Sequence, residues 1–348
     1  MIKNLVLSGG ALKGFSFIGV IEYLEDNNLL SNLETLVGSS AGSLICFLLC
    51  LNLTSLQIKK NCTVLLNSYL QEPIDLNLIF NLNQSLGIDN GHIIIDLLKE
   101  LCLEHFKADR ITFFEFVKKT GYNLVVCASN LTTREPTYFC VDNSPHVNVL
   151  DAIRASITIP FIFTPIVIDK QIYVDAGIFN HFPINFIKTF VLQDTLGIII
   201  KCNPYTPPKP LTFISYFRLL IDSMLERINI KDDILKNFNV IEIDCGNEDI
   251  FDFDFNTMKM TIDKHKVEEY IIKGYSSILS SAVKEKIKKG FLLFKDNEEQ
   301  QHFYENDVIK KDDLSLLQVP LLYSHYDFHF NRRLWDIFIV RDHNEILN

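Results

Sequence analysis

The chain lacks any stretch that is both long and apolar enough to cross a bilayer. Among its 348 residues the most apolar helical candidate, residues 41–53, is too short for a span and carries Ser43 and Asn52. The N-terminus, "MIKNLVLSGG", has no signal-peptide architecture and begins at once with a strand pattern. We therefore expect a soluble, cytoplasmic protein.

CxxC cysteine pairs and an excess of positive charge are also missing. The eight cysteines form no CxxC pair, and most stand in apolar surroundings such as "LICFLLC". This pattern argues against a disulfide framework or a zinc site and favours reduced thiols in the core. With 33 basic against 43 acidic residues the net charge is −10. That sign argues against a nucleic-acid partner.

What the sequence does contain is a regular alternation of strand and helix patterns. Strand-like segments at residues 2–7, 35–37 and 122–131 alternate with helical ones at 14–28 and 41–51. This order predicts a layered α/β fold. Residues 290–348 differ in character, with many charges and aromatics. We expect a main domain over 1–285 and a C-terminal extension of unknown role over 286–348.

The segment "LVGSSAG" interrupts the apolar pattern with Gly38, Ser40 and Gly42. In a G-x-S-x-G turn between strand and helix, the serine hydroxyl projects from a strained backbone while the glycines allow close packing. The following helix directs its positive end to the same place. The pattern alone does not distinguish a nucleophilic serine from an ordinary tight turn.

Two further segments fit the chemistry that such a serine needs. The loop "SGGALKG" follows the first strand, and the backbone N–H groups of Gly9, Gly10 and Ala11 are candidate donors to an oxyanion. Asp175, in "YVDAG", follows another strand and is succeeded by small residues up to Gly177. A carboxylate there can accept the serine proton. Strand ends are where α/β sheets gather their sites.

Together these segments resemble the patatin-like phospholipase family, also called patatin-like lipid acyl hydrolases. The resemblance rests on "LVLSGGALKGFSFIGVIEYLED", "LVGSSAG", "VLDAIRASITIPFIFTPIVI" and "YVDAG". It is clear over residues 3–185 and fainter to about 285. It implies a three-layer α/β/α fold with a central, mainly parallel sheet.

The resemblance also implies roles for single residues. It makes Ser40 the nucleophile and Asp175 the base of a dyad without histidine, and Gly9, Gly10 and Ala11 the oxyanion loop. The supporting motif positions are Lys13, Gly14, Gly38, Gly42 and Gly177. Ala11 and Ala176 stand where the family usually has glycine, and a positive φ at Ala11 would strain the loop.

By the same resemblance, the chain hydrolyses carboxylic esters of phospholipids or related lipids, without metal or organic cofactor. Transient membrane contact is expected, with residues 213–228 as the candidate segment. Pro160, Phe161 and Phe163 are candidates for an acyl-chain groove or for ordinary core. Two alternatives stay open: a Ser-His-Asp esterase using His181 or His265, and a catalytically silent lipid-binding protein on the same scaffold.

Overall fold

The computed structural model describes residues 2–71, 82–187, 194–201, 216, 219, 239–246, 251–254 and 259–288. The chain divides into two compact units, Met1–Ser277 and Ile278–Asn348. In the second unit only residues 278–288, the end of one helix, are described. The extension expected over 286–348 therefore lies almost wholly outside the described residues and stays a prediction.

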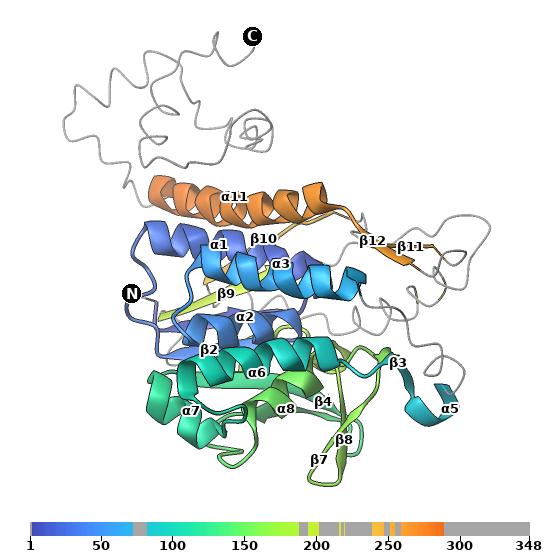
Figure 1. Ribbon diagram of the computed structural model, residues 1–348. Helices are drawn as coiled ribbons and strands as arrows, with labels where there is room; N and C mark the ends of the chain where they lie inside the picture. Colours follow the sequence, from blue (N-terminus) through green and yellow to red (C-terminus); the bar gives the residue numbers. More distant parts are fainter. Residues whose placement is uncertain are drawn as a thin grey trace, which may run out of the picture. The chain divides into compact units, whose positions relative to one another are not determined.

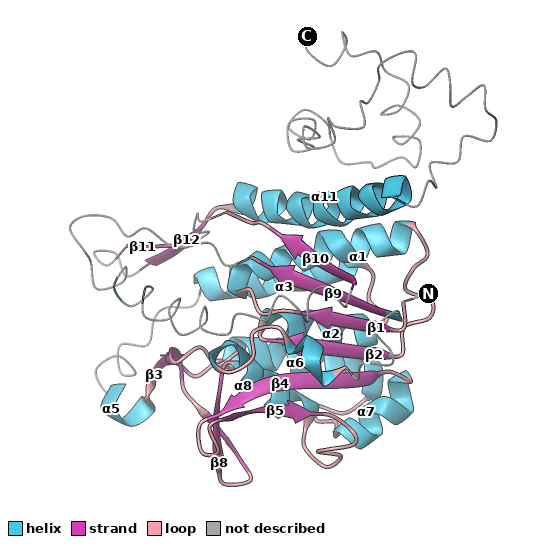
Figure 2. Ribbon diagram, turned by 180° about the vertical axis from the view of Figure 1, so that it is seen from behind, coloured by secondary structure: helices cyan, strands magenta, loops and turns pink. Residues whose placement is uncertain are grey.

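An eight-stranded sheet forms the centre of the first unit, in the order β10-β9-β1-β2-β4-β8-β7, with β5 also paired to β4 (Figures 1 and 2). From β10 to β4 all neighbours are parallel, whereas β5, β8 and β7 join antiparallel. The strands are β1 (Asn4–Leu7), β2 (Thr35–Ser39), β4 (Asn123–Asn130), β5 (Glu135–Phe139), β7 (Ile166–Ile168), β8 (Gln171–Val174), β9 (Thr195–Ile200) and β10 (Asn239–Ile243). The predicted α/β fold with a mainly parallel sheet is confirmed.

Helices flank the sheet, and the views from the two sides place the longer ones together on one face (Figures 1 and 2). The helices are α1 (Ser16–Asp26), α2 (Ala41–Cys50), α3 (Ser55–Gln71), α5 (Leu82–Ser85), α6 (His92–Phe106), α7 (Phe113–Thr120), α8 (Val149–Ser156) and α11 (Lys264–Lys288). Helix α2 is apolar nearly all round because it is buried between the sheet and other helices. Its Phe47 stacks on Phe116 of α7 with ring centroids 5.7 Å apart.

The opposite face of the sheet is covered, among the described residues, by the chain around the short 3-10 helix η3 (Pro183–Phe186). Val6, Val37 and Val125 are adjacent in register and fully buried there. Phe182, Ile184 and Ile187 complete that cluster. Apolar residues on both faces explain why these central strands read as continuous apolar runs.

Two small sheets and two further 3-10 turns complete the described part of the chain. Strand β3 (Gly87–Asp89) pairs with β6 (Phe161–Phe163), and β11 (Phe251–Asp254) pairs with β12 (Lys259–Ile262). The 3-10 turns are η1 (Ala11–Phe15), just after β1, and η2 (Ala176–Ile178), just after β8.

Glycines set the crossing of α1 and α11. A Cβ added to Gly19 would lie 1.9 Å from the carbonyl oxygen of Ile271, and one added to Gly274 would lie 1.8 Å from that of Ser16. No side chain fits at either position. The two helices therefore touch backbone to backbone, and α11 rests on the first turn of α1.

Candidate functional site

Ser40 occupies a strained turn between β2 and α2. Its φ of 49° and ψ of −123° lie outside the regions that non-glycine residues normally adopt. A conformation of this kind costs about 1–3 kcal/mol and persists only where the surroundings enforce it. Those surroundings are tight: a Cβ on Gly38 would lie 2.4 Å from Ser43 Cα, and one on Gly42 would lie 2.5 Å from Ser8 O.

The pairing of β4 explains why Ser40 and Asp175 meet. Strands β2 and β5 both pair with Val126 and Cys127, so they lie on opposite sides of β4. Strand β8 shares Ser129 and Asn130 with β5, and it therefore lies on the same side as β2. β2 and β8 thus approach each other end to end along β4. The next residue of β2 is Ser40, and the next residue of β8 is Asp175.

The two side chains share a hydrogen bond in a buried setting. Ser40 Oγ donates to Asp175 Oδ2 at 2.6 Å, and Gly177 N–H donates to Asp175 Oδ1 at 2.8 Å. Ser40 is 6% exposed and Asp175 5%. Burial raises the pKa of Asp175 to about 6, against the two hydrogen bonds, which lower it. The arrangement can therefore move a proton from a hydroxyl to a carboxylate near neutral pH.

The loop after β1 lies against Ser40 but differs in one detail from the expected set of donors. A Cβ on Gly9 would lie 3.5 Å from Ser40 Cβ and 2.9 Å from His181 Nδ1, so only glycine fits between them. However, Gly9 N–H donates to the carbonyl oxygen of His181 at 2.9 Å. Gly9 N–H is therefore already engaged in this conformation, and its expected role as an oxyanion donor stays a prediction.

Gly10 and Ala11 keep the character expected of an anion-binding loop. Neither N–H has a hydrogen-bond partner within the described residues. A Cβ on Gly10 would lie 2.4 Å from Ile200 Cδ1, so a larger residue would displace the end of that side chain on β9. Ala11 has φ 44°, the left-handed conformation for which glycine is preferred. Its methyl group is therefore held in a strained loop.

Lys13 and Gly14 tie this loop to its neighbours. Lys13 Nζ donates to the carbonyl oxygen of Gly246 at 2.7 Å, at the end of β10. A Cβ on Gly14 would lie 2.7 Å from Ala41 Cβ, in the first turn of α2. Lys13 thus anchors the loop to the chain after β10, and Gly14 lets the loop approach the turn at Ser40.

The end of α8 holds both members of the Ser40–Asp175 pair through groups that the motif analysis did not single out. Ser40 N–H donates to Ser156 Oγ at 2.9 Å. Two residues further on, the carbonyl oxygen of Thr158 accepts the N–H of Asp175 at 2.7 Å. A single short segment therefore fixes the backbone on each side of the pair.

Arg154 in turn fastens this segment to the rest of the fold. It is only 5% exposed, and its guanidinium donates to Thr158 Oγ1, to Asn90 O at 3.0 Å and to Thr164 O at 3.1 Å. It also lies over the ring of Phe163 at 5.1 Å. The sequence signal was the series Arg154, Ser156 and Thr158, polar residues at alternate positions in an otherwise apolar segment.

The two candidate histidines are not hydrogen-bonded to Ser40. The ring of His181 packs on the backbone of Gly9, has a hydrogen bond with the backbone of Ile200, and has its pKa lowered by burial to about 4. His265 is exposed at the start of α11, where its N–H donates to Asp263 Oδ1 at 2.9 Å. The geometry thus gives the Ser40 hydroxyl a carboxylate partner.

Other predicted features have mixed outcomes. Phe161 is 57% exposed, while Pro160 and Phe163 are half-buried, so this segment is not ordinary core. The candidate membrane segment, 213–228, lies outside the described residues except for two isolated positions. In the described part of the chain no helix is long and apolar enough to cross a membrane. Within the same residues no cluster of three or more His, Cys, Asp or Glu could hold a metal ion.

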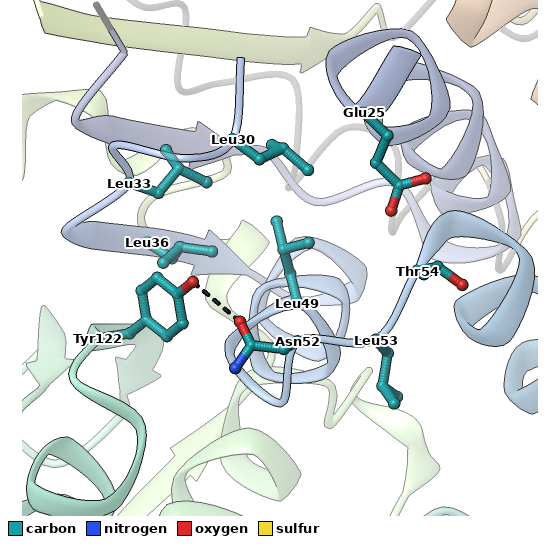
Figure 3. A pocket seen from close by; sticks show the side chains of 9 residues that line it. All are labelled: Glu25, Leu30, Leu33, Leu36, Leu49, Asn52, Leu53, Thr54 and Tyr122. Atoms are coloured by element: carbon teal, nitrogen blue, oxygen red, sulfur yellow. Dashed lines mark hydrogen bonds between the residues drawn. The ribbon is translucent and has the colours of Figure 1, made fainter. Parts of the chain in front are cut away.

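A cavity of about 130 Å³ lies at the other end of β2 and α2 (Figure 3). Its walls are mostly leucines, among them Leu36 and Leu49, and Tyr122 donates a hydrogen bond to Asn52 at its rim. Leu36 precedes Ser40 by four residues, about 13 Å along a strand. The cavity is therefore separate from the Ser40–Asp175 pair.

Comparison with known proteins identifies the family of the chain. The sequence matches the patatin-like phospholipase family over residues 5–187, more than half of the chain. The chain belongs to this family. Members of the patatin-like phospholipase family are lipid acyl hydrolases, and the family resemblance expected from the motifs is confirmed.

Two viral proteins are similar over the same part of this patatin-like chain. The probable lipid hydrolase 463L of Invertebrate iridescent virus 6 is 32% identical over 186 residues, which cover 53% of this chain and 62% of that protein. The uncharacterized protein R571 of Acanthamoeba polyphaga mimivirus is 27% identical over 204 residues, covering 57% and 65%. This chain therefore spans less than two thirds of either relative.

Solved structures with partial likeness include two from bacteria. VipD from Legionella pneumophila matches with a TM-score of 0.48 at 18% identity, covering 80% of this chain and 66% of that one. A chain in the complex of SpcU with ExoU from the type III secretion system of Pseudomonas aeruginosa matches with a TM-score of 0.44 at 14% identity, covering 80% and 52%.

Proposed function

We propose that the chain is a serine lipid acyl hydrolase in which Ser40 is the nucleophile and Asp175 the general base. The observation that carries the proposal is the 2.6 Å hydrogen bond from Ser40 Oγ to Asp175 Oδ2. In acyl transfer, the serine oxygen bonds to the ester carbonyl carbon while its proton passes to the carboxylate. Family membership supports a lipid ester as the substrate, and phospholipids are the class we propose.

The rest of the cycle follows from the groups around the pair. The N–H groups of Gly10 and Ala11, with the positive end of α2, stabilise the tetrahedral oxyanion. Asp175 then returns the proton to the leaving alkoxide, and the acyl group remains on Ser40. A water molecule, deprotonated by Asp175, attacks this acyl-enzyme and releases the fatty acid. No step requires a metal or an organic cofactor.

The test is hydrolysis of a lipid panel together with labelling by a fluorophosphonate probe. We expect the wild-type chain to be labelled at Ser40 and to release fatty acid, and Ser40→Ala to do neither. His181→Asn and His265→Asn are the matched controls, and each should keep the label. Loss of labelling in a folded histidine variant would favour the Ser-His-Asp alternative. Absence of labelling in the wild type would favour the silent lipid-binding alternative.

A further inference from the structure

The outer face of the β7–β8 hairpin carries aliphatic side chains where an exposed ribbon normally carries polar ones. Val167 of β7 pairs directly with Ile172 of β8, so their side chains lie side by side on one face. Leu131 follows the end of β4 and donates its N–H to Ile172 O at 2.9 Å. The exposed fractions are 63% for Val167 and 43% for both Ile172 and Leu131. We call these three residues the aliphatic row.

Folding of the hairpin depends on its other face. There Tyr173 packs on Phe139 with ring centroids 5.2 Å apart. Its hydroxyl accepts a hydrogen bond from Asn130 Nδ2 at 3.3 Å and donates one to Gln171 Oε1 at 3.1 Å. The aliphatic row takes no part in this network. Its exposure to water is therefore not a by-product of the packing that holds the hairpin.

The row lies beyond the Ser40–Asp175 pair at the same edge of the sheet. The β4–β8 register places Asp175 level with Ala128, whereas Ile172 is level with Leu131. Three residues of strand separate the two levels, about 10 Å. Asp175 follows β8 directly, so the strand that carries Ile172 also positions the proposed base. About 10 Å is less than half the thickness of a bilayer's hydrocarbon core, so a membrane that contacts the aliphatic row lies close to the Ser40–Asp175 pair.

We propose that the aliphatic row is the surface on which the protein docks onto a lipid bilayer. Three neighbouring aliphatic side chains fit the acyl-chain region at a membrane surface. The hairpin turn carries one charge of each sign, Asp169 and Lys170, and the whole chain has net charge −10. The attraction is therefore hydrophobic, and it favours neutral, zwitterionic lipid over anionic lipid. This inference extends the proposed function, since docking here presents the lipid ester to Ser40.

The test is sedimentation of the full chain with phosphatidylcholine vesicles, in the Ser40→Ala background so that no lipid is consumed. We expect the double variant Val167→Asp, Ile172→Asp to bind at least tenfold more weakly. Raising NaCl from 0.1 to 0.5 M should weaken binding of the parent less than twofold. The matched control is Leu56→Asp, at a 75% exposed leucine on α3, which should bind like the parent.

Several outcomes would overturn the proposal. They are failure of the parent to bind vesicles, equal binding by the parent and the double variant, and equal loss in the Leu56 control. A dimer in sedimentation velocity that the double variant dissociates would assign the row to contacts between copies instead. If the aspartates perturb folding, the double variant Val167→Thr, Ile172→Thr replaces them. It keeps the β-branched shape while adding polarity, and it should show the same loss of binding. Because binding is read without turnover, an inactive wild type would refute the proposed function and leave this test intact.

Discussion

The two ends of β2 and α2 differ in what the protein fold imposes on them. At the end toward Ser40, Ser40 and Ala11 have positive φ, and the carboxyl group of Asp175 is buried with its pKa raised to about 6. At the other end lies the cavity of Figure 3, lined mainly by leucines. Asn52 at its rim also has a positive φ, of 57°, but asparagine adopts this conformation more readily than serine or alanine, and its side chain pairs with Tyr122 near solvent. The Ser40 end is therefore the more strained and the more desolvated of the two. Reactivity is therefore expected where the fold is under strain, and cavity volume is a poor guide to it.

The largest effect should come from removing the carboxylate. Asp175→Asn should lower kcat by about 10²–10⁴ because it abolishes proton acceptance. The free energy of unfolding, in contrast, should increase. Because folding raises the pKa of Asp175 from 3.8 to about 6, keeping this carboxylate ionised at pH 7 costs the folded state about 3 kcal/mol. The free energy of unfolding at pH 7 should rise by up to that amount, as measured by urea titration.

The same variant tests the sign of that stability effect. The penalty of ionisation grows between the two pKa values, so wild type and Asp175→Asn should converge as pH falls from 7 to 4. A variant that is less stable than wild type at pH 7, by a margin unchanged at pH 4, would contradict the raised pKa.

Arg154→Lys should have the next largest effect, although Arg154 does not touch the pair. Lysine cannot reproduce the bonds to Asn90, Thr158 and Thr164, and the backbone that holds Asp175 would lose its anchor. We expect kcat to fall about 10–100-fold with little change in KM. The pKa seen in the pH–rate profile should rise, because weaker hydrogen bonds to Asp175 stabilise its charge less.

Arg110→Lys is the control for that change. Arg110 pairs with Asp151 at 2.9 Å on the surface, and its side chain is 67% exposed. This variant should leave both kcat and the pH profile as in the wild type. Equal losses in the two variants would show that Arg154 has no special link to the pair.

The pH profile of the wild type gives a further, milder effect. Because the base must be ionised, kcat/KM on a soluble ester should rise about tenfold per unit below pH 6 and then level off. An acid limb centred near 4, the range of an ordinary aspartate, would show that burial does not perturb Asp175 in solution.

Ala11→Gly should stabilise the protein slightly. Relief of the positive φ outweighs the extra freedom of glycine in the unfolded chain, by about 0.5–1 kcal/mol. Ala152→Gly, in the middle of α8, should destabilise by about 1 kcal/mol or more. Thermal unfolding of both variants should therefore shift in opposite directions. Shifts of the same sign would contradict the assigned strain.

The smallest effect is expected at the end with the cavity. Tyr122→Phe removes a 3.0 Å hydrogen bond to Asn52 and should cost about 0.5–1 kcal/mol, with activity unchanged. Lipid hydrolysis and thermal unfolding measured together would check both parts. A loss of activity here would show that the two ends are coupled through β2 and α2.

Local patterns were enough to predict the main elements and the three segments around Ser40. Strand β1, helix α2 and the hairpin turn at Asp169–Lys170 follow from short-range periodicity and turn chemistry. Gly38 and Gly42, on either side of Ser40, indicate the tight turn in the sequence because the fold leaves no room for a side chain at either position.

The remaining features depend on contacts between distant segments. That Gly9 N–H is occupied by His181 O follows from how two loops meet, and no spacing in the sequence encodes it. The end-to-end approach of β2 and β8 likewise needs the pairing of β4 on both sides. The alternating polar series Arg154, Ser156 and Thr158 marks this segment in the sequence, but the role of Arg154 is visible only through its partners.

The close contact of α1 with α11 connects a helix far along the chain to the loop beside Ser40. Gly274 presses on Ser16, the first residue of α1, which directly follows the turn containing Ala11. A methyl group at position 274 would force the start of α1, and with it the turn that carries the Gly10 and Ala11 N–H groups, to shift. If those two groups are the oxyanion donors of the proposed function, Gly274→Ala should lower kcat although residue 274 does not touch the Ser40–Asp175 pair.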